Sequence, residues 1–185
     1  YRAELVDPTT SQLTVVQESI FELTDQVTGE DQEQLISAVE RLSRTDAQTA
    51  ETIVTDCIDE ISSTSADSTP RWKIVRACAV GAPSVVLDHA QTLADHMKQS
   101  DEREAMAVLR VVEEAGNNIS SVPSVLARPV LRILESGNTD LVIQAINAIK
   151  VMGFYPPPKQ LLKLESDQRA TLSDAASRAT TNIKD

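Results

Sequence analysis

The two histidines are the residues of this sequence best suited to metal binding or proton transfer. His89 and His96 are seven positions apart, and the sequence has no other histidine. Helices that hold zinc between two histidines usually place them four positions apart, which brings both rings to one ion. A spacing of seven separates the rings by about 10 Å along a helix axis. We therefore expect solvated or half-buried histidines, with a metal-binding ladder that includes Asp88 and Asp95 as the alternative.

Paired carboxylates, which serve general acid–base catalysis, occur at two places. Asp101 and Glu102 form one pair, and Glu113 and Glu114 form the other. Adjacent residues of a helix point about 100° apart, so neither pair faces a single proton. The first pair suits a helix start, where negative charge is favourable. The second pair stands near a helix end, where negative charge is mildly unfavourable, and so hints at a binding partner.

The sequence offers no pattern for nucleophilic catalysis. It contains no Gly-x-Ser-x-Gly elbow, no metal-binding signature and no phosphate-binding loop. Cys57 and Cys78 lie among apolar residues without a histidine nearby in the sequence. We expect both to be buried free thiols. We also expect no cofactor and no enzymatic activity.

Apolar residues recur at helical spacing along nearly the whole chain. We predict ten helices and no strand, over residues 11–28, 31–42, 46–61, 70–81, 83–97, 101–115, 123–135, 139–152, 159–164 and 167–183. The residues expected to cap helix starts are Asp31, Asp46, Asp101 and Thr139. Prolines at 156–158 interrupt the chain after the eighth helix, beside two aromatic residues, Phe154 and Tyr155. These aromatics could form a docking site, but we expect them to hold the turn onto the core.

Two long helical runs in the middle of the chain reach a glycine in the same way. Gly116 and Gly153 are 37 residues apart, and the residues one, four, seven and eight positions before each are apolar. This repeat predicts one helix hairpin that is used more than once. Because each short helix cannot bury its apolar stripe alone, about five antiparallel hairpins should stack as an α-solenoid.

Length and charge indicate one acidic domain. The 185 residues suit a single helical-repeat domain over 1–185, with a polar loop at 62–69 that separates an acidic N-terminal third. Residues 1–67 hold 15 acidic and 3 basic side chains, a balance of −12, whereas the rest hold 13 and 14, a balance of +1. An acidic first third repels nucleic acid and anionic membranes.

A cytoplasmic location is expected. No stretch approaches the roughly 18 consecutive apolar residues that a membrane helix needs, and no signal peptide opens the chain. Six lysines against eleven arginines are compatible with a protein from a high-salt organism or with an ordinary acidic protein. The chain begins with Tyr1 and not Met, which keeps a domain of a larger protein among the alternatives.

The segment 124–153, SVLARPVLRILESGNTDLVIQAINAIKVMG, resembles a HEAT repeat. Such repeats have a leucine-rich first helix interrupted by proline, a turn with Asp or Asn, and a second helix rich in small residues. The matching positions are Pro129, Asn138, Asp140, Ala145 and Ala148. The resemblance implies an all-α, right-handed α-solenoid of HEAT or armadillo-like type, in which the second helices line the concave surface.

A stripe of polar side chains would then cross that surface. Its expected members are Arg103, Arg110, Gln144 and Asn147, extended by Arg71, Lys73 and Arg76 beside Trp72. Arginine and amide donors suit acidic protein segments or phosphates. An ordinary solvated face is the alternative.

Three functions follow from these observations as hypotheses. The first is a non-enzymatic protein–protein interaction module, a scaffold or adaptor, which binds through the second-helix face. The second, implied by the resemblance of some alkylpurine DNA glycosylases to this fold, is nucleic-acid binding with an aromatic side chain that cradles a base. The third is a structural or regulatory domain of a larger complex. We expect a protein partner, with no membrane and no nucleic acid.

Overall fold

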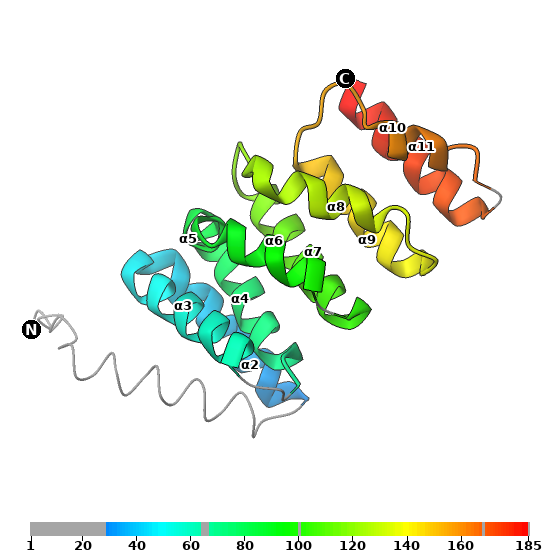
Figure 1. The fold of residues 1–185 in the computed structure, drawn as a ribbon. Helices are drawn as coiled ribbons and strands as arrows, with labels where there is room; N and C mark the ends of the chain where they lie inside the picture. The colour runs from blue at the N-terminus through cyan, green and yellow to red at the C-terminus, as the bar shows by residue number, and fades with distance from the viewer. Residues whose placement is uncertain (1–28, 64–66, 100, 168, 185) are drawn as a thin grey trace, which may run out of the picture.

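The structure, a computed structural model, describes residues 29–63, 67–99, 101–167 and 169–184. Within these ranges the chain forms ten α-helices, one short 3-10 helix and no strand (Figure 1). The helices are α2 (Glu30–Thr45), α3 (Ala47–Ser63), α4 (Thr69–Gly81), α5 (Pro83–Asp88), α6 (Ala90–Gln99), α7 (Glu102–Asn117), η1 (Ser124–Leu126), α8 (Ala127–Ile133), α9 (Thr139–Val151), α10 (Lys159–Leu164) and α11 (Ala170–Lys184). The helix predicted over 11–28 lies outside the described residues.

The helices stack in two layers that follow the order of the chain (Figure 1). Helices α2, α4, α7, α9 and α11 each pack against the next one, and we call this row the second-helix layer. The other row, the first-helix layer, contains α3, the pair α5 and α6, the pair η1 and α8, and α10. The predicted all-α solenoid fold is therefore confirmed for the described part of the chain.

The predicted apolar stripes form the core between these layers. One cluster of buried apolar residues extends from Val39 in α2 to Ala179 in α11. Each aliphatic side chain of the Val, Leu or Ile type contributes about 1.5–3 kcal/mol when it is fully buried. Small residues such as Ala145 and Ala148 on α9 are fully buried, which allows the helices of the second layer to approach closely.

Two of the four predicted N-caps are confirmed. The Asp46 carboxylate accepts hydrogen bonds from Gln48 N (3.0 Å) and Thr49 N (3.2 Å) at the start of α3. The Asp101 carboxylate accepts from Glu104 N (2.9 Å) at the start of α7. These bonds satisfy backbone donors that have no acceptor inside the helix.

The other two caps were predicted one or two residues too late. Helix α2 begins after Gly29, whose φ of 65° favours glycine, so Asp31 lies inside its first turn. Helix α9 is capped by Asn138, whose side-chain oxygen accepts from the backbone N–H groups of Asp140 (3.1 Å) and Leu141 (3.2 Å). Thr139 is thus the first helical residue and not the cap. Because asparagine reaches the free N–H groups from the preceding position, it takes the capping role.

Two predicted helices of the first layer are each divided. The helix expected over 83–97 breaks at His89 into α5 and α6. The helix expected over 123–135 is η1 followed by α8, so Pro129 lies in the first turn of α8 and not in a helix interior. Proline lacks an N–H group, and a first turn has no intrahelical acceptor for one. The loop expected over 62–69 is also shorter, since α3 extends to Ser63 and α4 begins at Thr69.

The two glycines of the repeat have different structural roles. Gly153 follows α9 with a φ of 65°, which is the ending expected of a helix. Gly116 is instead a buried residue inside α7, which continues to Asn117. A Cβ atom at Gly116 would lie 2.7 Å from Val151 Cβ of α9 and would also collide with Val151 Cγ2. The prediction that Gly116 ends its helix is therefore wrong, because this glycine provides the close contact between α7 and α9.

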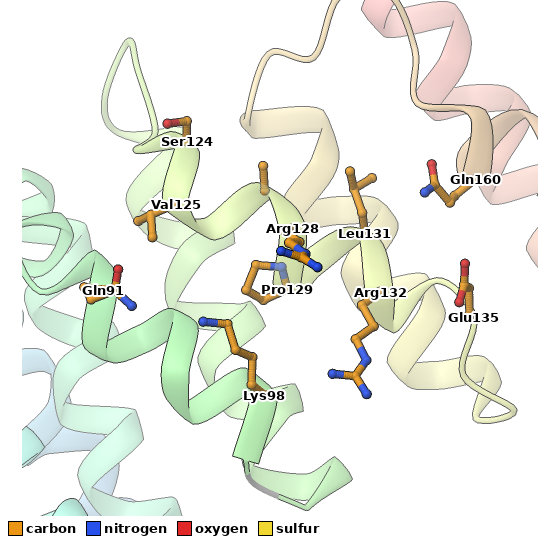
Figure 2. Close-up of a pocket in the computed structure, with 11 residues that line it drawn as sticks. Gln91, Lys98, Ser124, Val125, Arg128, Pro129, Leu131, Arg132, Glu135 and Gln160 are labelled. Carbon is orange, nitrogen blue, oxygen red and sulfur yellow. The ribbon is translucent and has the colours of Figure 1, made fainter.

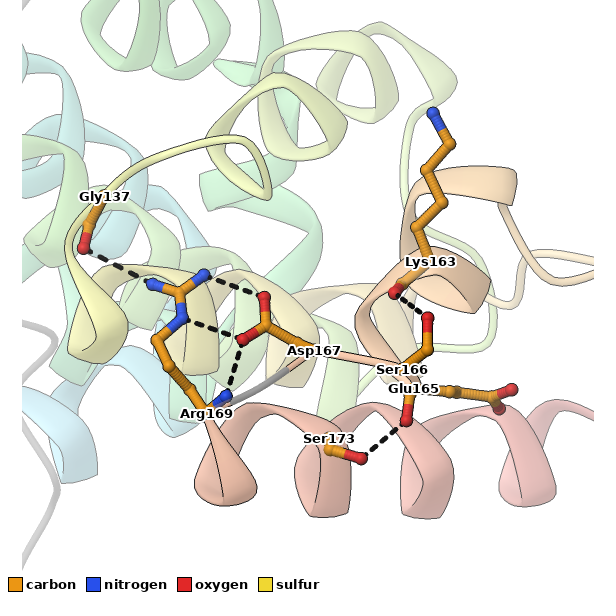
Figure 3. A network of polar contacts seen from close by, with 7 residues as sticks. All are labelled: Gly137, Lys163, Glu165, Ser166, Asp167, Arg169 and Ser173. Carbon is orange, nitrogen blue, oxygen red and sulfur yellow. Dashed lines mark hydrogen bonds and ion pairs between the residues drawn. The ribbon is translucent and has the colours of Figure 1, made fainter.

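A polar network closes the last hairpin (Figure 3). The Arg169 guanidinium donates to both carboxylate oxygens of Asp167 (3.0 and 3.1 Å) and to the carbonyl of Gly137 (3.4 Å) in the loop before α9. The Ser173 hydroxyl donates to the carbonyl of Glu165 (2.6 Å), which joins the first turn of α11 to the end of α10. The bond to Gly137 links the residue before α11 to the preceding hairpin, whereas the other bonds hold the α10–α11 connection, all outside the apolar core.

Replacement of Gly116 by alanine tests the close contact between α7 and α9. Alanine is favoured over glycine in a helix by about 1 kcal/mol. The collision with Val151 should outweigh this gain and destabilise the protein by about 1–3 kcal/mol, measured by urea denaturation. Gly137→Ala is the control, because a Cβ there meets no atom within 4 Å. Equal or greater stability of the Gly116→Ala variant would contradict the close packing.

Candidate binding face on the second-helix layer

The predicted polar stripe lies mostly on one face of the second-helix layer. Arg103 and Arg110 are exposed on α7, and Arg76 is exposed on α4. Gln144 and Asn147 are half-buried on α9. The three helices are neighbours, since α4 packs against α7 and α7 packs against α9.

Several of these donors are bonded to carboxylates of the neighbouring helix. Arg76 of α4 forms an ion pair with Glu114 of α7, with its two nitrogens 3.0 and 3.3 Å from one carboxylate oxygen. The Gln144 amide of α9 donates to Glu113 of α7. The two glutamates that seemed misplaced near a helix end therefore have partners within the chain, on opposite sides of α7. Exposed pairs of this kind contribute about 0–1 kcal/mol each, so they orient neighbouring helices more than they stabilise them.

The remaining members of the stripe differ in their availability. Arg103 forms an ion pair with Asp67 (3.0 Å), just before α4. The Asn147 side-chain oxygen accepts from Lys150 Nζ (3.2 Å) on the same helix. Arg110 has no hydrogen bond or ion pair with any other residue of the described ranges. Among the described residues it is thus the one guanidinium of the predicted stripe that holds no carboxylate.

Arg71 does not belong to this face. Its residue is only 7% exposed, and its guanidinium forms an ion pair with Glu60 of α3 (2.7 Å). The side chain points between the two layers because Arg71 occupies the inward side of α4, next to the buried Trp72. The prediction that Arg71 extends the exposed stripe is wrong. The Arg71 guanidinium instead lowers the pKa of the Glu60 carboxyl below its ordinary value through a hydrogen bond.

Lys73 takes the exposed position on α4, at the edge of a pocket that the sequence did not reveal. The pocket lies between α2, α4 and α7 and has a volume of about 640 Å³. Its apolar lining includes Ile36, Ala77 and Val80. Its polar lining includes Gln32, Glu33, Glu40, Lys73, Arg76 and Glu114. Helix α2 contributes because it packs on α4, a contact between hairpins that no sequence pattern specifies.

Trp72 is buried and bonded, so it is not positioned to stack on a nucleic-acid base. It is 2% exposed, and its indole nitrogen donates to Glu104 Oε1 (3.2 Å). Its ring meets the edge of His96 with the ring centres 5.4 Å apart. Residues separated by 24–32 positions thus form one polar cluster between α4, α6 and α7.

This cluster contains a serine, a histidine and a glutamate in an order that resembles a catalytic triad. Ser62 Oγ lies 3.3 Å from His96 Nε2, and His96 Nδ1 lies 3.1 Å from Glu104 Oε1. The serine hydroxyl, however, donates its proton to the carbonyl of Ile58 (2.8 Å) on its own helix. Its proton is therefore directed at the Ile58 carbonyl and not at His96, so the histidine does not activate this serine. Together with a contact between Thr55 and His89 (3.5 Å), these bonds connect α3 with the α5–α6 segment.

Both histidines are half-buried, one of the two surroundings expected for them. Among the described residues, no group of three or more His, Cys, Asp or Glu side chains could hold a metal ion. Cys57 and Cys78 are buried free thiols. Burial raises the pKa of the Cys78 thiol to about 12 and also raises the pKa of the Cys57 thiol, which favours the protonated form of both at neutral pH.

The aromatic pair before the prolines is divided between core and surface. Phe154 packs against the apolar core, as expected for a residue that holds the turn in place. Tyr155 is 82% exposed.

Comparison with known proteins supports the fold and gives no family. No family model matches the chain, and no curated protein matches it. One similar solved structure is an engineered protein, with a TM-score of 0.59 and 16% identity over 91% of this chain and 79% of the other. Another is a designed armadillo repeat protein in complex with the peptide (KR)4, with a TM-score of 0.57 and 12% identity over 94% of this chain and 86% of the other. These likenesses support an armadillo- or HEAT-like solenoid. None of the helices in the described ranges has the length and apolar character needed to cross a membrane.

Replacement of Glu60 by glutamine tests the ion pair with buried Arg71. The pKa of Glu60 in the folded protein is lower than its ordinary value of 4.5. The charged carboxylate therefore contributes its full stabilisation at pH values above 4.5. This contribution is lost as the pH falls through the folded-state pKa. We expect a loss of about 1 kcal/mol or less at neutral pH, because Glu60 is more than a third exposed and solvent screens the pair. The difference from the wild type should shrink in acid. Glu51→Gln, an exposed position on the same helix, is the control for urea denaturation, and a pH-independent difference would contradict the ion-pair origin.

Proposed function

We propose that this protein is a non-enzymatic interaction module that binds a protein segment along the exposed face of α2, α4, α7 and α9. The observation that carries the proposal is the combination of the pocket between α2, α4 and α7 with the polar stripe on α7 and α9. Together they make a surface with an apolar recess, hydrogen-bond donors and carboxylates. The partner chemistry that fits such a mixed surface is a polypeptide, which offers apolar side chains and both kinds of hydrogen-bonding group.

Arg110 is the most available anchor for such a segment. It is exposed and holds no carboxylate of the described residues, so a partner carboxylate would not have to displace one of them. Arg103 and Arg76 are already paired with Asp67 and Glu114, and a partner would exchange one pair for another. Arginine is well suited to this role because its planar group can hold a carboxylate through two hydrogen bonds.

The apolar recess supports binding of a side chain from the same segment. Ile36, Ala77 and Val80 supply apolar surface, while Lys73 and Arg76 stand beside Glu33 and Glu40 at its polar edge. Buried apolar contacts surrounded by polar groups are typical of the energetically important part of protein interfaces. A designed armadillo repeat protein of similar fold was solved with a bound peptide, which supports a peptide-sized partner for a surface of this shape.

The same features count against nucleic acid as the partner. Carboxylates at Glu33, Glu40, Glu113 and Glu114 are interleaved with the basic side chains of this face. A nucleic-acid surface needs an excess of positive charge to neutralise phosphates. It also commonly uses aromatic side chains to stack on bases, and Trp72 is buried.

Charge reversal at Arg110 tests the proposed face. The probes are peptides selected on the wild-type protein from a random display library. We expect them to bind the Arg110→Glu variant about tenfold more weakly, and the Arg103→Glu, Arg110→Glu double variant more weakly still. The reason is that an attraction between arginine and a peptide carboxylate becomes a repulsion between two carboxylates. The measurement is isothermal titration, with circular dichroism to show that helical content is unchanged. Arg178→Glu is the matched control, since Arg178 is exposed on α11 and forms no ion pair in the described part of the chain.

Two results would contradict the proposal. Equal peptide affinity for the wild type and the double variant would exclude the α7 face. Binding of duplex DNA that weakens steeply with added salt, in the absence of peptide binding, would favour the nucleic-acid alternative.

A further inference from the structure

A second groove lies on the first-helix layer, apart from the face proposed above. It runs between α6 and the η1–α8 segment, with Gln160 of α10 on its far side (Figure 2). Its volume is about 910 Å³. Figure 2 shows Gln91 and Lys98 on α6, and Arg128, Leu131 and Arg132 on α8.

The groove concentrates basic side chains that form no ion pair within the part of the chain that the structure describes. Of the ten arginines in the described ranges, five form ion pairs. Arg128 and Arg132 are among the other five, are both exposed, and hold no carboxylate of a described residue. They are four positions apart on α8, so their Cα atoms are separated by about 6 Å along the helix axis.

Other charges at the groove only partly offset this pair. Lys98 Nζ lies 2.8 Å from Asp95 Oδ1, so its charge is largely balanced on its own helix. Glu135 lines the groove at the end beyond α8. The groove therefore carries positive charge in a chain whose formal net charge is −11. The negative net charge of the chain opposes the long-range attraction of an acidic partner. Once the partner is in contact, the positive groove favours short-range ion pairs with its carboxylates.

Apolar side chains beside the arginines distinguish this groove from a simple anion site. Val125 is 37% exposed, and Leu131 is partly buried against the core. Both line the groove together with Pro129. No aromatic residue of the described ranges lines it, so this lining offers no stacking surface of the kind that single-stranded nucleic acids use. The surface suits a ligand with both carboxylates and an aliphatic side chain.

We propose that this groove is a docking site for an acidic segment of a partner protein. Two carboxylates one helical turn apart, or at alternate positions of an extended strand, match the spacing of Arg128 and Arg132. A neighbouring leucine-like side chain of the segment packs on Val125 and Leu131. The site does not depend on the second-helix face, because its lining comes from α6, η1, α8 and α10 and none of it from α2, α4, α7 or α9.

The test uses a short fluorescent peptide composed of glutamate and leucine, and a matched peptide in which glutamine replaces every glutamate. The first peptide should bind the wild-type protein in fluorescence polarisation, and the second should bind at least tenfold more weakly. The double variant Arg128→Glu, Arg132→Glu should lose about tenfold or more in affinity for the acidic peptide, as expected when two charge pairs become repulsive. Both side chains are exposed, so circular dichroism should be unchanged.

Two controls separate this proposal from the one above. Arg178→Glu should bind the acidic peptide as the wild type does, which excludes a general effect of charge. Arg110→Glu should also bind normally, so the failure of one site is distinguishable from the failure of the other.

Three results would overturn the docking site. They are equal binding of the acidic and the glutamine peptide, equal affinity of the Arg128→Glu, Arg132→Glu variant and the wild type, and binding of an oligonucleotide without binding of the acidic peptide.

Discussion

The close approach of neighbouring second helices is the constraint on which the rest of this structure depends. Gly81 at the end of α4 leaves no room for a side chain, since a Cβ there would lie 2.7 Å from Arg44 N and 2.8 Å from the Glu40 carbonyl of α2. Gly116 creates the corresponding contact between α7 and α9. Beside the α7–α9 contact, Gln144 of α9 bonds to Glu113 of α7, and on the other side of α7 its Glu114 pairs with Arg76 of α4. The stacking of the second helices thus determines which polar side chains of the exposed face lie within reach of one another.

Much of the fold could be predicted because helix signals are local. The 3.6-residue spacing of apolar residues gave helices close to the observed ones, including α10 at Lys159–Leu164. The local rules were less decisive where two candidates stood side by side. Asn138 and Thr139 are both suitable caps, and only the geometry of the turn selects asparagine. The HEAT-like pattern placed Pro129 in a helix interior, whereas the 3-10 turn before α8 moves it to a first turn.

The candidate site was less predictable because its properties arise between hairpins. Seven-residue spacing correctly placed Arg103 and Arg110 on one exposed face, but it carries no information about Asp67, which pairs with Arg103. Arg71 illustrates the same limit. It is buried and paired with Glu60, whereas Lys73, two positions later on α4, is exposed and donates to Gln32. The α2 contribution to the pocket and the pairing of Glu113 with Gln144 both depend on contacts that sequence spacing does not encode.

The hydrogen bonds that join one hairpin to the next have a consequence for how the chain reaches this structure. Their partners are separated by between 31 and 41 positions, as in Gln144 with Glu113 and Lys73 with Gln32. The loop that must close for each new hairpin is therefore short and nearly constant, and its entropic cost does not rise as the array lengthens. Proteins dominated by such local contacts have low contact order and fold quickly. An array of this kind can begin folding at any hairpin and grow in both directions, so its length is set by the number of units and not by a requirement for its two ends to meet.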